Sequence, residues 1–132
     1  MSYCILLVDD SSVVRHMVRK AIEMSGLDVG RIVEAANGNE ALQAMEESWI
    51  DVVVADINMP VMTGAEMVEQ MVARDFMATT PVIIVSSEKS AKRIEELKRL
   101  GVKAYLNKPF RPEQIKQVIG EVLRERKEAV HA

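Results

Sequence analysis

The sequence predicts a doubly wound α/β fold, in which helices cover both faces of a five-stranded parallel sheet. Four short runs rich in Val, Ile and Leu show no alternation with polar residues, which is typical of strands buried on both faces: residues 4–8, 52–55, 82–85 and 104–107. Helical patterns fall between these runs, and such alternation of strand and helix favours right-handed crossovers. Each run also ends in a polar residue.

The first helix is expected over residues 12–25, with Gly26 as a stop. Its buried face should hold Val14, Met17, Val18, Ala21 and Ile22. Residues 31–35 fit a short second strand. Asn37 stands three residues before Glu40, an N-cap signature for a second helix that runs to about residue 47.

A capping box at residues 63–66 predicts the third helix. This helix should bury Met67, Val68, Met71 and Val72. The fourth helix covers about residues 91–100 and stops at Gly101, and its apolar stripe is thin. The fifth has Pro112 in its first turn. Its apolar spacing is that of an amphipathic helix, through Ile115, Val118, Ile119, Val122 and Leu123.

The 132 residues are expected to form a single domain, over residues 1–132, with no output domain attached. Cys4 is the one cysteine and lies in a predicted buried strand, so no disulfide can form within the chain. That composition fits a reducing, cytoplasmic compartment. No apolar run approaches the length needed to span a membrane, so membrane insertion is not expected.

The net charge of −3 conceals an asymmetry along the chain. Residues 1–88 hold 5 Lys and Arg against 14 Asp and Glu, whereas residues 89–127 hold 12 against 5. The basic C-terminal third suggests a surface for an acidic partner, although such charges also occur on plain solvated helix faces. Nucleic acid is not expected as a partner, because the whole chain is acidic and the basic stretch has few aromatic residues.

The polar residues that follow the apolar runs lie where parallel sheets bind ligands. We expect five of them to converge at one edge: Asp9, Asp10, Asp56, Ser86 and Lys108. Clustered carboxylates favour a cation, and all-oxygen ligands favour Mg²⁺, or Mn²⁺, over zinc or copper. Lysine and serine side chains suit a phosphoryl group. A carboxylate nucleophile beside a metal and a lysine suggests an acyl-phosphate intermediate.

Each of these residues has an ordinary explanation when taken alone. The aspartates and the serine are common in turns and caps, and a lysine is usually a solvated surface residue. Four polar ends in succession, each directly after an apolar run, favour a joint role instead.

The motifs resemble those of the response-regulator receiver domains of two-component signalling, from one end of the chain to the other. The matching segments are residues 8–12, 56–60 with Gly64, 85–88 and 104–110. This resemblance implies a flavodoxin-like fold with strand order 2-1-3-4-5. Departures from the family pattern are mild, and the main one is Ser87, where Ala or Gly is usual.

The resemblance also implies roles for the acids and the lysine. Asp56 would accept a phosphoryl group from the phosphohistidine of a histidine kinase. Asp10, Asp56 and the main-chain carbonyl of Asn58 would bind Mg²⁺ directly, with Asp9 acting through water. Lys108 would contact the phosphoryl oxygens. The chain would not be an enzyme beyond its own self-catalysed phosphorylation and dephosphorylation.

Further roles follow from the same resemblance. Ser86 and Tyr105 would change position on phosphorylation, and Asn58 and Glu88 would tune dephosphorylation. The Lys108–Pro109 peptide would be cis, which proline makes accessible. Phosphorylation adds about −1.5 to −2 charges. That charge would bias the face of the fourth helix, fifth strand and fifth helix.

Within the family, the stand-alone chemotaxis (CheY-like) regulators fit best, because the opening motif ends in Arg15 and the Asn58/Glu88 pair flanks the site. Such regulators are diffusible cytoplasmic messengers that are read by the flagellar motor switch. We expect a monomer before phosphorylation, and a phosphatase is a further partner to consider. The partner face would include Lys89, Lys92, Arg93, Tyr105 and Lys116. A phosphorelay shuttle or an adaptor-binding module outside chemotaxis is the alternative.

Three other functions share parts of this pattern. A flavin protein of flavodoxin type would need a phosphate loop after the first strand, where Asp9 and Asp10 would repel the phosphate. A haloacid-dehalogenase-like phosphatase would carry an Asp-x-Asp motif there, whereas these two acids are adjacent. An interaction module without phosphorylation would usually have lost the acids or the lysine, and this chain keeps them.

Overall fold

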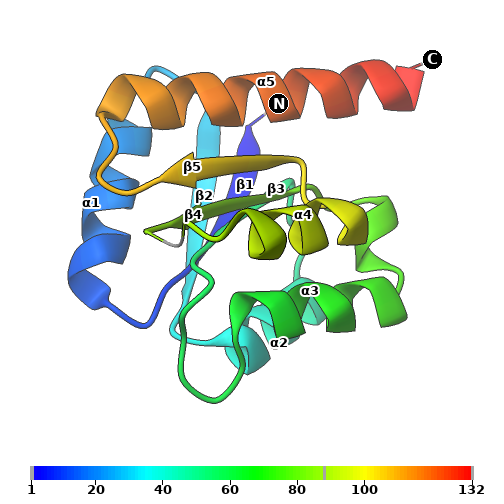
Figure 1. The fold of residues 1–132 in the computed structure, drawn as a ribbon. Helices are drawn as coiled ribbons and strands as arrows, with labels where there is room; N and C mark the ends of the chain where they lie inside the picture. The colour runs from blue at the N-terminus through cyan, green and yellow to red at the C-terminus, as the bar shows by residue number, and fades with distance from the viewer. Residues whose placement is uncertain (1, 88, 132) are drawn as a thin grey trace.

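The structure of the chain is a computed structural model, which describes residues 2–87 and 89–131. It contains a five-stranded parallel sheet in the order β2-β1-β3-β4-β5 (Figure 1). The strands are β1 (Tyr3–Val8), β2 (Val29–Ala35), β3 (Val52–Ala55), β4 (Val82–Ser86) and β5 (Ala104–Asn107). The predicted fold class and the strand order implied by the family resemblance are therefore confirmed.

Helices cover both faces of the sheet. They are α1 (Ser12–Glu23), α2 (Gly38–Glu47), α3 (Gly64–Ala73), α4 (Ala91–Leu100) and α5 (Pro112–His131), with a short 3₁₀ turn η1 (Phe76–Ala78) after α3. Helices α1 and α5 lie on one face of the sheet, and α2, α3 and α4 lie on the other (Figure 1). Each face therefore packs against its own apolar cluster.

Helix boundaries follow the capping residues. The Asn37 side chain accepts a hydrogen bond from the Glu40 N–H, and Thr63 and Glu66 form the predicted capping box. Gly101 ends α4 at a φ of 110°, a left-handed conformation that favours glycine. Helix α1 ends earlier than predicted, at Glu23, and β2 begins earlier, at Val29.

Several positions that the sequence placed in the core are less buried than expected. Val14 and Val118 are half-buried, and in β5, an edge strand, Leu106 alone is buried. Met17 and Val72 are 60% and 44% exposed. Each lies at the edge of the apolar stripe of its helix, where the helix surface faces away from the sheet. Cys4 is half-buried, because it lies at the start of β1, near the rim of the sheet. Strands β3 and β4, which lie inside the sheet, are buried along their full length, as predicted.

The Lys108–Pro109 peptide is cis, as expected. Among the described residues, no helix combines the length and the apolar character needed to cross a bilayer.

Candidate functional site

Two aspartates from neighbouring strands form the centre of the site. Asp9 follows β1 and Asp56 follows β3, and the strand register pairs Val8 with Ala55, the residues that precede them. The Asp56 N–H donates to the Val8 carbonyl at 2.9 Å, so strand pairing sets the separation of the two acids. Both aspartates are buried, at 6% and 9% exposure. Burial of two acids side by side is unfavourable unless positive charge compensates them.

Asp10 adds a third, exposed carboxylate. One carboxylate oxygen from each of Asp9, Asp10 and Asp56 lies within 4.8 Å of the others. This donor set consists of hard oxygen ligands, and its exposed member leaves room for water. The residues present therefore fit Mg²⁺ or Mn²⁺, ions that bind through a few carboxylates and keep several waters.

Lys108 reaches this cluster from the end of β5. Its Nζ lies 3.1 Å from Asp9 Oδ2 and 3.7 Å from Asp56 Oδ2. The register between β4 and β5 pairs Ser86 with Asn107, and the Lys108 N–H donates to the Ser86 carbonyl at 3.0 Å. The lysine is thus fixed at its backbone by the sheet, while its ammonium group bridges the two buried acids.

Ser86 completes the inner part of the site. It ends β4 and is fully buried, at 0% exposure, and its hydroxyl is hydrogen-bonded to the Asp56 carboxyl. A further contact of Asp56 is local, since Oδ1 accepts a hydrogen bond from the N–H of the next residue, Ile57, at 2.8 Å. Asp56 is therefore held in one orientation by groups that can donate to a phosphoryl oxygen as well as to a carboxylate.

The electrostatic state of Asp56 reflects this crowding. Burial raises the pKa of the Asp56 carboxyl above its ordinary value, and the charge of Asp9 adds to the rise. The Lys108 ammonium and the hydrogen bonds from Ile57 and Ser86 oppose the rise without cancelling it. A cation bound among the three acids would favour the ionised carboxylate, which is the nucleophilic form.

The loop after β3 brings α3 close to the acid. The Gly64 N–H donates to the Ile57 carbonyl at 2.7 Å, and a Cβ at Gly64 would overlap the main-chain oxygen of Asp56. Glycine at this position therefore allows the start of α3 to pack directly on the backbone of the acid. The family resemblance rested partly on this glycine, and the close approach gives the physical reason for it.

The other residues named from the sequence lie around this centre. Asn58 is exposed two residues after Asp56, and Tyr105 is half-buried in β5. Glu88 lies outside the described residues. Of the proposed partner face, Lys89, Lys92 and Lys116 are exposed, and Arg93 is half-buried in α4. The edge strand β5 runs between α4 and α5, so these residues belong to one side of the molecule (Figure 1).

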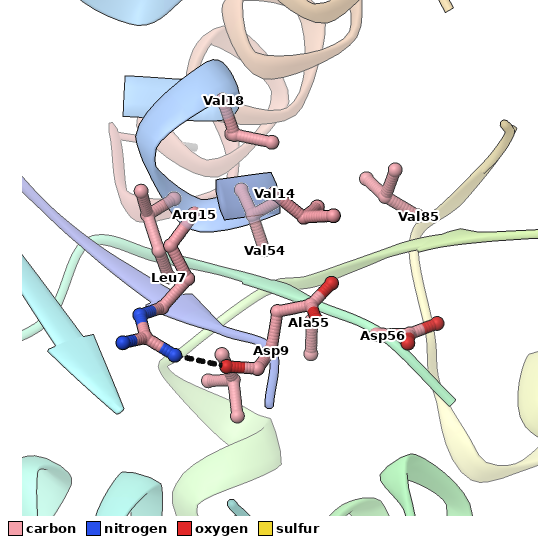
Figure 2. A pocket seen from close by; sticks show the side chains of 10 residues that line it. Leu7, Asp9, Val14, Arg15, Val18, Val54, Ala55, Asp56 and Val85 are labelled. Carbon is pink, nitrogen blue, oxygen red and sulfur yellow. Dashed lines mark hydrogen bonds between the residues drawn. The ribbon is translucent and has the colours of Figure 1, made fainter. Parts of the chain in front are cut away.

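Sequence reasoning missed a contact below the acids. Arg15 donates through Nη1 to the main-chain carbonyl of Asp9 and through Nε to Glu34 Oε1 at 3.0 Å. Figure 2 shows this guanidinium beside Asp9, at a cavity of about 10 Å³ under the acids, which has room for about one water. The sequence identifies Arg15 only as the end of the opening motif, and no sequence signal connects it with Glu34, which lies 19 residues away.

Comparison with known proteins places the chain in a family. The model of the response regulator receiver domain matches residues 5–120, so the chain belongs to that family. A chemotaxis protein CheY homolog of Campylobacter jejuni is 32% identical over 120 residues, which cover 90% of this chain and 91% of the relative. The relationship therefore extends over nearly the full length of both proteins.

Solved structures agree with this assignment. The chemotaxis protein CheY4 of Vibrio cholerae superposes with a TM-score of 0.83 at 34% identity, over 92% of this chain and 99% of that one. A CheY-like response regulator receiver domain protein from Methanospirillum hungatei superposes with a TM-score of 0.85 at 26% identity, over 98% and 99% of the two chains. The chain is thus a receiver domain of the CheY-like kind, a class that works with histidine kinases and downstream targets.

Proposed function

We propose that Asp56 is the phosphoacceptor and takes a phosphoryl group from the phosphohistidine of a histidine kinase in a Mg²⁺-dependent reaction. The main support is the placement of the buried Asp56 carboxylate, 3.7 Å from Lys108 Nζ and hydrogen-bonded to Ser86, within the cluster of three acids. Of these acids, Asp56 is the one whose carboxyl contacts both a lysine and a buried hydroxyl, the two groups suited to phosphoryl oxygens.

In the transfer, a carboxylate oxygen of Asp56 forms a bond to phosphorus while the bond between phosphorus and the imidazole nitrogen breaks. The imidazole keeps the electron pair of that bond. Lys108 holds a phosphoryl oxygen by charge and the Ser86 hydroxyl donates to another. Asp10, Asp56 and the Asn58 main-chain carbonyl would hold Mg²⁺, with Asp9 acting through water, and the ion would supply positive charge for the phosphoryl oxygens.

Phosphorylation changes the partners of Lys108 and Ser86. Both groups now contact Asp56 or Asp9, and a phosphoryl group would compete for them. Ser86 ends β4 and Tyr105 lies in β5, opposite Ile84 in the register, so a shift at the site reaches the α4–β5–α5 face. That face carries Lys89, Lys92, Arg93, Tyr105 and Lys116, which suit an acidic target.

Chemotaxis is the pathway we propose. The CheY homolog of Campylobacter jejuni and CheY4 of Vibrio cholerae are both named as chemotaxis proteins, and the likeness covers almost all of each. The target would be the flagellar motor switch, and Asn58 and Glu88 would set the rate of dephosphorylation with or without a phosphatase. A phosphorelay shuttle or an adaptor-binding module is the alternative, and it would use the same Asp56 chemistry.

We further propose that the chain has no separate substrate to turn over and is therefore not an enzyme. Its chemistry would be confined to the gain and loss of its own phosphoryl group. It would act in the cytoplasm, as a monomer before phosphorylation.

The test is intact mass after incubation with acetyl phosphate, with and without Mg²⁺, on the wild-type chain and on Asp56→Asn. We expect one phosphoryl adduct on the wild type that requires Mg²⁺, and none on the variant. Asp75→Asn is the matched control, because Asp75 is exposed at the far end of α3 and its left-handed conformation is one that asparagine tolerates. An equal adduct on Asp56→Asn would mean that another residue is the acceptor.

A further inference from the structure

We propose that Arg15 is a positioning residue for the acid cluster: its guanidinium sets the orientation of the Asp9–Asp10 peptide, and Glu34 holds the guanidinium in place. This inference rests on the proposed function, since it concerns how the same site binds Mg²⁺ and accepts a phosphoryl group. It assigns a role to two residues that carry no chemistry themselves.

The contacts of Arg15 join three segments of the chain. Arg15 lies in the first turn of α1, its Nη1 donates to the Asp9 carbonyl beyond the end of β1, and its Nε donates to Glu34 in β2. The side chain is only 16% exposed, so it does not extend into solvent as most arginines do. Both bonds are charge-assisted, and the planar guanidinium can make them together because its donors point in fixed directions.

Asp9 is held from opposite sides. Its carboxylate accepts from the Ser11 N–H at 2.9 Å and from Lys108 Nζ at 3.1 Å, and its main-chain carbonyl accepts from Arg15. Figure 2 shows the carboxylate on the side of Asp56 and the carbonyl on the side of Arg15. The side-chain bonds fix the Asp9 carboxylate, and the Ser11 bond also closes a turn around Asp10, whereas the Arg15 bond acts directly on the carbonyl of the peptide that leads to Asp10.

The orientation of that peptide decides where Asp10 points. The Asp9 carbonyl and the Asp10 N–H belong to one rigid plane, so rotation of the carbonyl rotates the start of Asp10 with it. Asp10 is exposed. The backbone at Asp10 sets the direction in which its side chain leaves the chain, and so which rotamers bring the carboxylate to the cluster. Arg15 would therefore affect the third acid of the metal cluster without touching it.

Glu34 is itself held by a second arginine. Arg19, one turn further along α1, approaches Glu34 Oε2 at 3.1 Å and also donates to the Ile32 carbonyl at 3.1 Å. Glu34 thus accepts from two guanidinium groups on one face of α1. The Arg15–Glu34 pair is therefore part of a network of charged groups. An isolated surface ion pair usually contributes little, whereas pairs within a network contribute more.

The test measures the Kd for Mg²⁺ by isothermal titration calorimetry on the wild type, Arg15→Ala, Arg15→Lys and Glu34→Gln. Loss of a residue that orients metal ligands typically weakens binding by about 10–100-fold. We expect about 10-fold for Arg15→Ala and a smaller loss for Glu34→Gln. The control is Glu46→Gln, which weakens the exposed pair between Glu46 in α2 and Arg74, the residue that follows α3.

Arg15→Lys separates positioning from simple charge. It keeps a positive charge near the acids, but a single ammonium cannot reproduce the two-pronged contact with the Asp9 carbonyl and Glu34. We expect it to bind Mg²⁺ nearly as weakly as Arg15→Ala. The rate of phosphorylation by acetyl phosphate at saturating Mg²⁺ should also fall in both variants, since misplaced ligands persist when the ion is bound.

Several results would overturn the inference. It fails if Arg15→Ala and Glu34→Gln bind Mg²⁺ like the wild type, or if only their melting temperatures fall, because Arg15 would then merely join α1 to β2. If Arg15→Lys binds Mg²⁺ as tightly as the wild type, the positive charge of Arg15 matters and its positioning contacts do not. If Arg15→Ala does not fold, Glu34→Gln decides alone. A wild-type chain that takes up neither Mg²⁺ nor a phosphoryl group would refute the proposed function itself, which is a distinguishable outcome.

Discussion

Replacement of Asp51 should lower the free energy of unfolding substantially. Asp51 lies at the end of the sheet opposite to the functional site. It lies just before β3 and its carboxylate accepts three hydrogen bonds. Oδ2 accepts from the Cys4 N–H at 2.8 Å, and Oδ1 accepts from Trp49 Nε1 at 3.0 Å and from Arg126 in α5. The Arg126 guanidinium also lies over the Trp49 ring, 5.0 Å from its centre. This carboxylate therefore joins β1, β3 and α5.

Asp51→Asn should cost about 2–4 kcal/mol of unfolding free energy. If the substituted amide kept its oxygen toward Trp49 and Arg126, its NH₂ would face the Cys4 N–H, and an N–H that loses its partner costs about 1–3 kcal/mol. Weakening the ion pair with Arg126, which is 18% exposed, adds about 1 kcal/mol. For a chain of 132 residues, the sum should lower Tm by roughly 8–16 °C.

The pH dependence gives a second readout of the same contact. Burial would raise the pKa of the Asp51 carboxyl, but the bonds from Cys4, Arg126 and Trp49 outweigh it, so the folded pKa lies below the ordinary value. A carboxyl whose pKa is depressed on folding stabilises above its unfolded pKa, near 4, and loses that contribution as the pH falls through the folded pKa. The difference between wild type and variant should shrink as the pH is lowered from 7 toward 3.

Urea unfolding followed by circular dichroism at pH 7, 5 and 3 measures both effects. Glu46→Gln is the control, because its ion pair with Arg74 is exposed and should contribute at most about 1 kcal/mol. A loss below about 0.5 kcal/mol for Asp51→Asn at pH 7 would show that the three bonds do not hold the sheet to α5. A difference that stays constant across the pH range would refute the assignment of the effect to the ionised carboxylate.

Four further predictions concern the functional site. Asp56→Asn should raise stability to urea at neutral pH without Mg²⁺, because the raised pKa means that the charged carboxylate destabilises the folded state above that pKa; equal stability of both chains would contradict it. Gly64→Ala should destabilise the fold by about 1–3 kcal/mol, since its Cβ would meet the Asp56 carbonyl; an unchanged Tm would mean that the loop relaxes freely. Lys108→Ala should leave Mg²⁺ binding largely in place and weaken target binding of the chain activated with beryllofluoride; normal target binding would remove Lys108 from the switch. Neutralising Lys92 and Arg93 should weaken binding to the purified motor switch more at low salt than at high salt, and equal affinities at both would place the docking face elsewhere.

The fold could be predicted from the sequence because its signals are local. Non-alternating apolar runs mark the strands, and caps such as Asn37 and Thr63 mark the helix starts within a residue. The errors arose where burial depends on which neighbour a helix meets. Met17 and Val72 have the spacing of core residues but lie at the edges of their stripes, and spacing alone does not say how wide the covered stripe is.

The centre of the site was predictable for a different reason. Parallel strands bring their carboxyl ends to one edge, so Asp9, Asp56 and Lys108 converge however far apart they lie in the sequence. The contacts beneath that centre were not predictable. The pairing of Arg15 with Glu34 depends on the direction in which two side chains from different layers point, and nothing in the pattern of either segment encodes it.

The two ends of β3 show why residue type and position alone do not identify function. Asp51 precedes the strand and Asp56 follows it, so the sequence offers two acids beside one buried run. Asp51 accepts bonds from three donors, one of them an arginine, and its pKa falls; Asp56 is more buried, faces a second acid, and its pKa rises. A buried carboxylate whose charge is only partly compensated is stabilised by a bound cation, or by a covalent bond that removes its charge. A carboxylate that is already paired with several donors gains little from either. The opposite directions of the two pKa shifts therefore distinguish Asp51, which is paired within the fold, from Asp56, the proposed phosphoacceptor.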